Sequence, residues 1–282
     1  MSKEIGASPI DGIGRAMNRT PADRFRPRWE EVEIRSRLAS IARTYPEPLV
    51  ESQLGSIDRV AFELEIVLRN APGAGTLCDL GGGIGMFPIA CAALGMRTIL
   101  VDDFQDPVCF EHGQPTRELH KRYGVEVLMR DLVEEGLDLP PETIDVFTIF
   151  DSMEHWHHSP KPVFGAVMRA LRPGGLFVLS GPNCANLRKR ITLLFGRGKW
   201  SAMHDWYDAP RFRGHVREPD VEDLRYIARD MDLIQVRILG RNWAGWGSRL
   251  RLIRIITPFV DSMLRLRPSL CSDLYLIGNK RA

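Results

Sequence analysis

Apolar residues along the chain form two patterns, short continuous runs and stripes with helical spacing. Segments with these two patterns alternate along the sequence, which predicts a layered α/β protein. Short apolar runs are typical of buried strands in a parallel sheet. The predicted strands are 76–80, 98–102, 125–130, 144–150, 175–180, 232–239 and 273–279. Segments with helical spacing fall between them, at 85–94, 114–122, 160–171 and 220–230. This order predicts a doubly wound, mostly parallel sheet of seven strands with helices on its faces.

Two helical stripes precede the first strand and predict an N-terminal helical cap over 29–72. Pro46 and Pro48 separate the stripes, and a turn at 70–73 ends the second. Residues 1–28 are polar and follow no period, which predicts a flexible arm. The main domain is therefore expected over 73–282. The apolar positions of the stripes are Ile34, Leu38, Ile41, Tyr45, Leu54, Ile57, Val60, Ala61, Leu64, Val67 and Leu68.

Length, net charge and cysteine content are those of a globular protein with one core. The 282 residues suffice for one substantial core, and the net charge of +2 argues against a nucleic-acid partner. The five cysteines form no Cys-x-x-Cys pair, so we expect reduced thiols and a cytoplasmic location. We expect no signal peptide, because the N-terminus lacks an apolar segment, and no run reaches the roughly 18–20 apolar residues of a membrane-spanning helix. The oligomeric state stays open.

A glycine-rich turn, Asp79-Leu80-Gly81-Gly82-Gly83-Ile84-Gly85, follows the first predicted strand and precedes a helix. Such a turn lets a ligand approach both the backbone and the helix N-terminus. The dinucleotide fingerprint requires a glycine three positions after its second glycine. Met86 and Pro88 stand at those positions, counted from Gly83 and Gly85, so the spacing fits a dinucleotide poorly.

Acidic residues follow the second and third predicted strands. Asp102 and Asp103 end the run at 98–102, where a doubly wound sheet places a ribose diol beside the glycine turn. An ionised aspartate can accept hydrogen bonds from both ribose hydroxyls. Asp131 follows the strand at 125–130 in the same way. The simpler alternative is that these are solvated acids at strand ends.

Together these motifs resemble the class I S-adenosylmethionine-dependent methyltransferases. The turn matches their acid-x-Gly-x-Gly-x-Gly motif, and Asp102 lies 23 residues after Asp79, as in that family. Three further segments resemble motifs of the ubiquinone-pathway type of small-molecule O-methyltransferase. They are Glu154-His155 with Pro160, Leu171-Arg172-Pro173-Gly174-Gly175, and Gly214-His215-Val216-Arg217. The resemblance runs from residue 76 to about 240 and implies S-adenosylmethionine as cofactor. The cofactor contacts that it implies are Asp79, Gly81, Gly82, Gly83, Gly85, Asp102, Asp103, Asp131, Leu132, Phe150 and Asp151.

The segment after the fourth strand carries the candidates for chemistry. His155 is the best general base for an oxygen or nitrogen acceptor, although it could instead only shape the loop. Asp151, Glu154 and His155 have the spacing i, i+3, i+4, which brings three side chains onto one face of a helical turn. Some relatives bind a metal with such a segment and a later histidine, for which His215 is the candidate. We therefore expect catalytic roles for His155 and His215, and a Mg²⁺ or Mn²⁺ site made by Asp151, Glu154, His155 and His215.

Two later segments bear on the acceptor. Residues 181–219, which we call the lid, interrupt the strand–helix alternation, and their aromatic residues could form an acceptor pocket or a small core of their own. These aromatic residues are Trp200, Trp206, Tyr207 and Phe212. Residues 248–267 form a basic amphipathic segment that could lie on an anionic membrane, or pack on the protein.

The sequence thus predicts transfer of a methyl group from S-adenosylmethionine to oxygen on a small molecule, a sugar or a lipid-linked intermediate. We expect the protein in the cytoplasm, with peripheral contact to the inner membrane surface if the acceptor is lipid-linked. Two alternatives stay open. One is a metal-dependent RNA 2′-O-methyltransferase, and the other is a non-catalytic cofactor-binding protein with a role in assembly or regulation.

Overall fold

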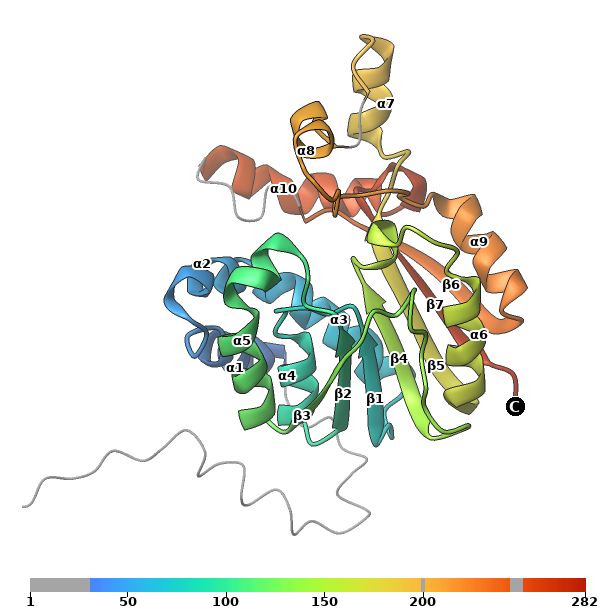
Figure 1. Cartoon of the computed structure of the whole chain (residues 1–282). Coiled ribbons are helices and arrows are strands. Elements are labelled where there is room, and N and C mark those ends of the chain that lie inside the picture. The colour runs from blue at the N-terminus through green and yellow to red at the C-terminus, as the bar shows by residue number, and fades with distance from the viewer. Residues whose placement is uncertain (1–30, 199–200, 244–250) are drawn as a thin grey trace, which may run out of the picture.

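The protein folds around one seven-stranded sheet with helices on both faces (Figure 1). The computed structural model describes residues 31–198, 201–243 and 251–282. The strand order is β3-β2-β1-β4-β5-β7-β6, in which β7 runs antiparallel to both of its neighbours and the first five strands are parallel. The strands are β1 Thr76–Leu80, β2 Arg97–Asp102, β3 Val125–Met129, β4 Ile144–Phe150, β5 Leu171–Pro182, β6 Leu233–Arg241 and β7 Asp273–Lys280. The sequence prediction of a mostly parallel, doubly wound sheet is confirmed.

Helices connect and cover the strands. The N-terminal helices are α1 Glu31–Ala42, α2 Glu47–Gly55 and α3 Ile57–Asn70. Those of the alternating region are α4 Phe87–Ala93, α5 Pro107–Arg122, α6 Lys161–Ala170 and α9 Val221–Asp230. The remaining ones are α7 Leu187–Leu194, α8 Met203–Tyr207, α10 Arg251–Leu264 and the short 3₁₀ helices η3 Met153–His155 and η4 Pro268–Leu270.

The two faces of the sheet bury separate hydrophobic clusters because successive strand residues point to opposite sides. On one face, Leu77 and Val146 pack with residues of the helices α1 to α5. On the other face, Cys78 and Phe147 pack with residues of α6 and α9. The N-terminal helices therefore share a core with the sheet. The predicted arm, 1–28, lies outside the described residues.

Two elements differ from the sequence expectation. Strand β5 begins at Leu171 rather than near residue 175, and its register with β4 shifts between Ile144 and Val146. The Arg172–Gly175 segment, expected as a turn before the strand, lies inside β5, with Gly174 at φ +72°. Helix α5 begins at Pro107 rather than near 114 and contains Pro115. Proline weakens the helical signal of a sequence, which explains why the first part of α5 was not predicted.

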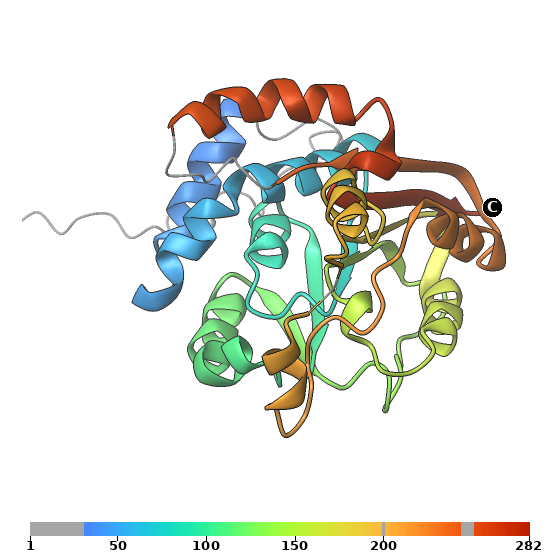
Figure 2. The same ribbon diagram turned by 90° about the horizontal axis from the view of Figure 1, so that it is seen from above.

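The carboxyl ends of β1, β2, β3, β4 and β5 meet at one edge of the sheet because these strands are parallel. The lid lies above this edge, as the view from above shows (Figure 2). Ligands of open α/β sheets bind in the crevice at this edge. No helix among the described residues has both the length and the apolar character needed to cross a bilayer.

Candidate active site

The glycine turn brings the end of β1 into close contact with the segment after β4. Gly81 has φ +73°, a conformation that favours glycine, and its backbone N–H donates to Val101 O at 2.8 Å. A Cβ atom on Gly81 would lie 1.8 Å from Oγ of Ser152. Only glycine fits here, and the bare backbone forms part of a cavity wall.

Asp102 is fastened to the glycine turn by hydrogen bonds. Its carboxylate accepts from the backbone N–H groups of Gly83 at 2.9 Å and Phe104 at 2.6 Å. Burial raises the pKa of Asp102 to about 6, although both hydrogen bonds oppose this shift. The side chain therefore has a fixed orientation beside the turn, which suits the predicted contact to a ribose diol.

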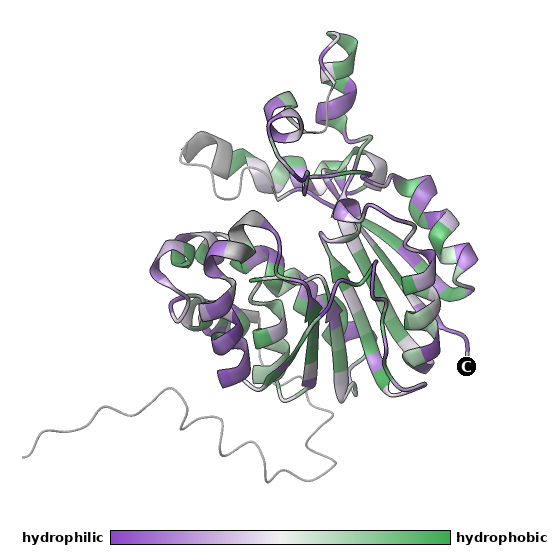
Figure 3. Cartoon of the chain, viewed as in Figure 1, coloured by the Kyte–Doolittle hydropathy of each residue, from purple (hydrophilic) through white to green (hydrophobic). Residues whose placement is uncertain are grey.

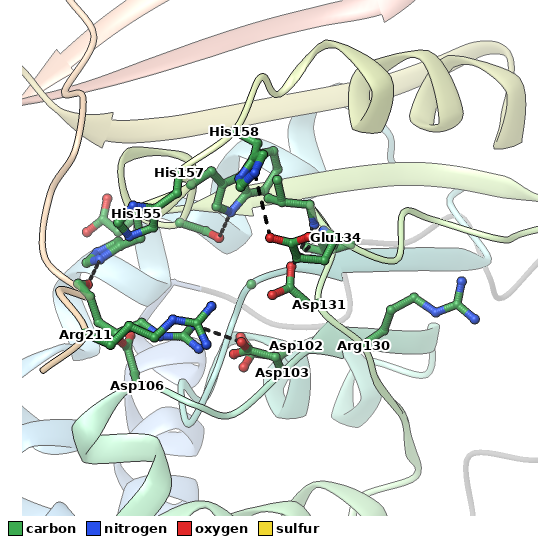
Figure 4. Close-up of a pocket in the computed structure, with 17 residues that line it drawn as sticks. Asp102, Asp103, Asp106, Arg130, Asp131, Glu134, His155, His157, His158 and Arg211 are labelled. Atoms are coloured by element: carbon green, nitrogen blue, oxygen red, sulfur yellow. Dashed lines mark hydrogen bonds and ion pairs between the residues drawn. The ribbon is translucent and has the colours of Figure 1, made fainter.

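A cavity of about 120 Å³ opens between the ends of β1, β2, β3 and β4. Figure 4 shows acids from the ends of β2 and β3 on one side and the histidines that follow β4 on the other. Among the residues predicted to contact the cofactor, those lining the cavity are Gly81, Asp102, Asp103, Asp131, Leu132 and Asp151. The carboxylate of Asp131 accepts from the backbone N–H groups of Val133 and Glu134, which fixes the turn after β3.

The other predicted cofactor residues lie behind the cavity wall. Asp79 is buried and accepts a hydrogen bond from Oγ1 of Thr148 at 2.6 Å, and burial raises its pKa to about 7. Phe150 packs edge-on against Phe87 at a ring-centroid distance of 4.8 Å. The glycines at 82, 83 and 85 complete the turn, and a Cβ atom on Gly82 would lie 2.1 Å from Oδ2 of Asp79. Asp79 and these glycines belong to the turn and its base, whereas the lining residues face the cavity.

Sequence reasoning missed several residues that line the cavity. Ser152 accepts a hydrogen bond from Nε1 of Trp156 at 3.1 Å, and both follow β4. Their position at a strand end was a usable signal. Arg213 pairs with Asp103, Nη1 to Oδ2 at 2.9 Å, from the far side of the lid. No local pattern indicates this pair, because its members are 110 residues apart.

Glu154, His155 and His215 form a compact group above β4 and β5. One potential ligand atom from each lies within 4.8 Å of the others. The Glu154 side chain is 1% exposed, and neither carboxylate oxygen has a hydrogen-bond partner. Burial, and then the negative charge of Asp151, raise the pKa of Glu154 well above its usual value. Such an unpartnered buried carboxylate beside two imidazoles has the chemistry of a divalent-cation site.

Hydrogen bonds orient both imidazole rings of this group. Nδ1 of His155 lies 2.7 Å from the carbonyl oxygen of Arg213, and Nδ1 of His215 lies 2.9 Å from Oε1 of Glu218. Burial alone would raise the pKa of Glu218, but hydrogen bonds from His215 and Lys189 lower it, so its carboxylate is ionised. Because these oxygens only accept, each Nδ1 carries the hydrogen, and the neutral form of each ring has its lone pair on Nε2. Metal ligands and general bases share this arrangement.

Asp151 lies outside this group of ligand atoms, so the structure brings together three of the four residues predicted to bind a metal. Asp151 has φ +46°, and its carboxylate pairs with Nη2 of Arg59 in α3 at 2.5 Å. The left-handed conformation interrupts the helical turn on which the i, i+3, i+4 argument depends. Only Met153–His155 form a turn of 3₁₀ helix.

A second cavity, of about 480 Å³, lies beneath α8. His155, Arg211 and Arg213 line both cavities, so the two adjoin at these side chains. Residues 208–217, which we call the strap, form much of the shared wall. The backbone N–H of Val216 donates to Glu154 O at 2.7 Å, and Nε2 of His157 lies 2.9 Å from Phe212 O. The strap is thereby held against the segment after β4.

The lid aromatics only partly fit the pocket expected from the sequence. Phe212 lines the second cavity, whereas Trp206 and Tyr207 are exposed. Their helix, α8, spans only five residues and buries none of them, which leaves these rings without a core to enter. Trp200 lies outside the described residues.

Comparison with known proteins identifies the family. Residues 55–238, more than half of the chain, match the family model described as a methyltransferase domain. The chain therefore belongs to this methyltransferase family. Two curated relatives, each described as an uncharacterized methyltransferase, come from the Mycobacterium sp. strains KMS and MCS. Each is 32% identical over 123 residues, which cover 43% of this chain and 44% of the relative. The match thus spans less than half of these relatives.

Solved structures agree on the fold. A SAM-dependent methyltransferase from Archaeoglobus fulgidus has a TM-score of 0.51 at 20% identity, over 79% of this chain and 94% of that one. Phosphoethanolamine N-methyltransferase 2 from Haemonchus contortus, solved with S-adenosyl-L-methionine, has a TM-score of 0.54 at 15% identity, over 94% of this chain and 61% of that one. The chain thus has the class I methyltransferase fold. We call the cavity beside the glycine turn, which six of the predicted cofactor contacts line, the cofactor cavity.

Proposed function

We propose that this methyltransferase transfers the methyl group of S-adenosylmethionine to a hydroxyl oxygen of a small molecule, a sugar or a lipid-linked intermediate. The observation that carries the proposal is the position of His155, which lines both the cofactor cavity and the cavity beneath α8. An acceptor in the second cavity would meet the methyl donor beside this imidazole.

The chemistry requires little from the protein beyond alignment and proton removal. The sulfonium of the cofactor is already an activated electrophile. Holding the acceptor oxygen in line with the methyl group at short range supplies several kcal/mol. A hydroxyl acceptor also loses a proton, which Nε2 of His155 can accept because Nδ1–H is engaged by Arg213 O.

The test separates binding from turnover. We expect His155→Ala to lower methyl transfer by about 10²–10⁴-fold while its affinity for S-adenosylmethionine, measured by isothermal titration, changes little. His158→Ala is the matched control, because His158 lines the same cavity on the same segment but lies outside the second one. Radiolabelled transfer is screened against metabolites, lipids and RNA. Tight cofactor binding without transfer to any fraction would favour a non-catalytic role, and transfer to RNA alone would favour the 2′-O-methyltransferase.

We further propose that Glu154, His155 and His215 hold a divalent cation. Support comes from the unpartnered, buried carboxylate of Glu154 and from the potential ligand atoms of the three side chains, which lie within 4.8 Å of one another. Two imidazoles and one carboxylate favour a borderline ion such as Mn²⁺ over Mg²⁺. Such an ion supplies Lewis acidity that lowers the pKa of a nearby hydroxyl. His155 would then serve as a ligand, and Glu218 would fix the ring of His215.

Metal binding can be measured without turnover. The electron paramagnetic resonance signal of free Mn²⁺ should fall on addition of the wild-type protein, with one site for each chain. Glu154→Gln should weaken this binding by at least about tenfold, since loss of one ligand removes charge and a donor together. Glu134→Gln, a change of an exposed acid that lines the cofactor cavity, is the control. Equal binding by all three proteins would exclude the site and leave His155 as the base.

A further inference from the structure

Exposed apolar side chains project from α7, away from the active site. Leu194 and Phe195 at the end of α7 are 84% and 77% exposed, and Ile191 and Leu193 beside them are exposed as well. No residue of α7 is buried. Figure 1 shows α7 as a projection from the body of the molecule, at the end where the strands point towards the lid. An apolar helix tip in this position gains nothing from the protein's own core.

Helix α10 has its apolar side turned outward. Ile255, Phe259 and Met263 recur at a spacing of four residues and are all exposed. Thr257 and Asp261 on the other side are buried, and Oδ1 of Asp261 accepts from the backbone N–H and from Nδ2 of Asn242, both at 3.0 Å. A surface helix normally buries its apolar face and exposes its polar face. From Ile255 onward, helix α10 does the opposite.

Exposed arginines accompany the apolar residues of α7 and follow those of α10. Residues 187–198 contain no acid, and Arg188, Arg190 and Arg197 are exposed there. Beyond the stripe of α10, Arg265 and Arg267 are exposed, whereas Asp261 is buried. The exposed apolar residues of α7 and α10 are therefore flanked by positive charge, whereas α8 carries the exposed acid Asp205. This combination complements an anionic bilayer, which takes up apolar side chains and attracts flanking arginines.

The segments lie at the same end of the molecule. In Figure 1, α7, α8 and α10 stand above the sheet on the side of the strand carboxyl ends, and Figure 3 shows hydrophobic colouring on α7 and along α10. Exposed Met203, Trp206 and Tyr207 of α8 add to this end. We define the docking face as the exposed apolar side chains of α7, α8 and α10 with their neighbouring arginines.

We propose that the docking face rests on the surface of an anionic lipid bilayer, with the α7 tip and the outer side of α10 in the interface. Separate apolar segments fit a fluid bilayer better than they fit a protein partner, whose docking site is typically one contiguous patch. This inference deepens the proposed function and rests on it for the acceptor. The cavity beneath α8 would face the membrane, so the acceptor would be a hydroxyl compound with a lipid tail.

The test uses vesicles and needs no acceptor. The full chain is sedimented with vesicles of phosphatidylcholine alone, and of equal parts phosphatidylcholine and phosphatidylglycerol. We expect binding to the anionic vesicles and at least about tenfold weaker partitioning for the double variant Leu194→Glu, Phe195→Glu, because burial of either side chain is lost. Phe259→Glu tests α10 separately, with an expected loss of the same order. Arg188→Gln should weaken anionic binding about fivefold and leave neutral vesicles unaffected.

Tyr226→Glu is the matched control, because this exposed ring, 65% accessible, belongs to α9, which packs against the sheet and contributes no residue to the docking face. Titration with S-adenosylmethionine verifies that each variant is folded. The proposal is overturned if the wild-type protein ignores anionic vesicles, or if Tyr226→Glu weakens binding as much as the α7 variant. It is also overturned if light scattering shows a dimer that the α7 variant dissociates, since the docking face would then bind a second copy. None of these outcomes depends on methyl transfer, so the proposed function is tested independently.

Discussion

The side of the site that we assign to the cofactor and the side that we propose for the acceptor are built differently. On the cofactor side, Asp102 and Asp131 lie at strand ends, and backbone N–H groups fix their carboxylates. The N–H of Gly83 in the glycine turn donates to Asp102, and the N–H of Val133 donates to Asp131. On the acceptor side, the strap is held by side chains and carbonyl groups far apart in sequence, such as His155 with Arg213. The sheet therefore determines the first side, whereas the second depends on how the lid folds over it.

The largest effect should come from the cofactor side, where the glycine turn touches the segment after β4. We expect Gly81→Ala to weaken cofactor binding by about a hundredfold, or to prevent folding, because its Cβ atom would lie 1.8 Å from Ser152 Oγ. Overpacking and left-handed strain together cost about 2–4 kcal/mol. Urea unfolding and isothermal titration measure both consequences. Gly124→Ala is the control: this glycine has φ +82° but nothing within 4 Å of the added atom, so it isolates the strain. Equal losses in both variants would contradict close contact at Gly81.

A smaller effect is expected within the cofactor side. Asp102→Ala should weaken S-adenosylmethionine binding by about 1–3 kcal/mol, or about five- to 150-fold, as a charged hydrogen-bond partner is lost. Asp106→Ala changes another acid on the same cavity and should have a smaller effect. Isothermal titration compares the two. Indistinguishable affinities would move the ribose contact away from Asp102, with Asp103 next to be tested.

The same carboxylate predicts a pH dependence of cofactor affinity. With a pKa of about 6 in the folded protein, Asp102 is ionised at pH 8 and mostly protonated at pH 5. The ionised form accepts both ribose hydroxyl hydrogen bonds, so affinity should fall as the pH falls, by about tenfold between pH 7 and pH 5. Asp102→Asn, which cannot titrate, should bind weakly with a flat profile. A slope in the variant equal to that of the wild type would assign the titration to another group.

The smallest effect should come from the acceptor side. The pair between Arg213 and Asp103 is about one quarter exposed on each side chain, and such pairs contribute about 1 kcal/mol or less. We expect Arg213→Gln to change the melting temperature by at most a few degrees and cofactor affinity by less than about fivefold. Its main effect should be a raised KM for the acceptor, because the strap is loosened. A cofactor affinity as low as that of Asp102→Ala would mean that the strap belongs to the cofactor side.

These two sides also differ in how far the sequence predicted them. The spacing from Asp79 to Asp102 predicted that the glycine turn and the acids at the strand ends lie together. The structure brings them together, because the apolar pattern of each strand shows where that strand ends. The sequence could not tell which of the predicted residues line the cavity. Phe150 was predicted to contact the cofactor but packs against Phe87, and the sequence pattern does not show such packing between side chains. Glu154, His155 and His215 do gather as the motifs indicated. Asp151 does not join them, and its carboxylate instead forms an ion pair with Arg59 of α3.

The most direct test is a crystal structure with S-adenosylhomocysteine bound. We predict its ribose hydroxyls on the carboxylate of Asp102, its adenine beside Asp131, and its sulfur directed towards His155 at the boundary with the second cavity. A product bound with its sulfur turned away from His155, or bound outside the cavity beside the glycine turn, would contradict the account.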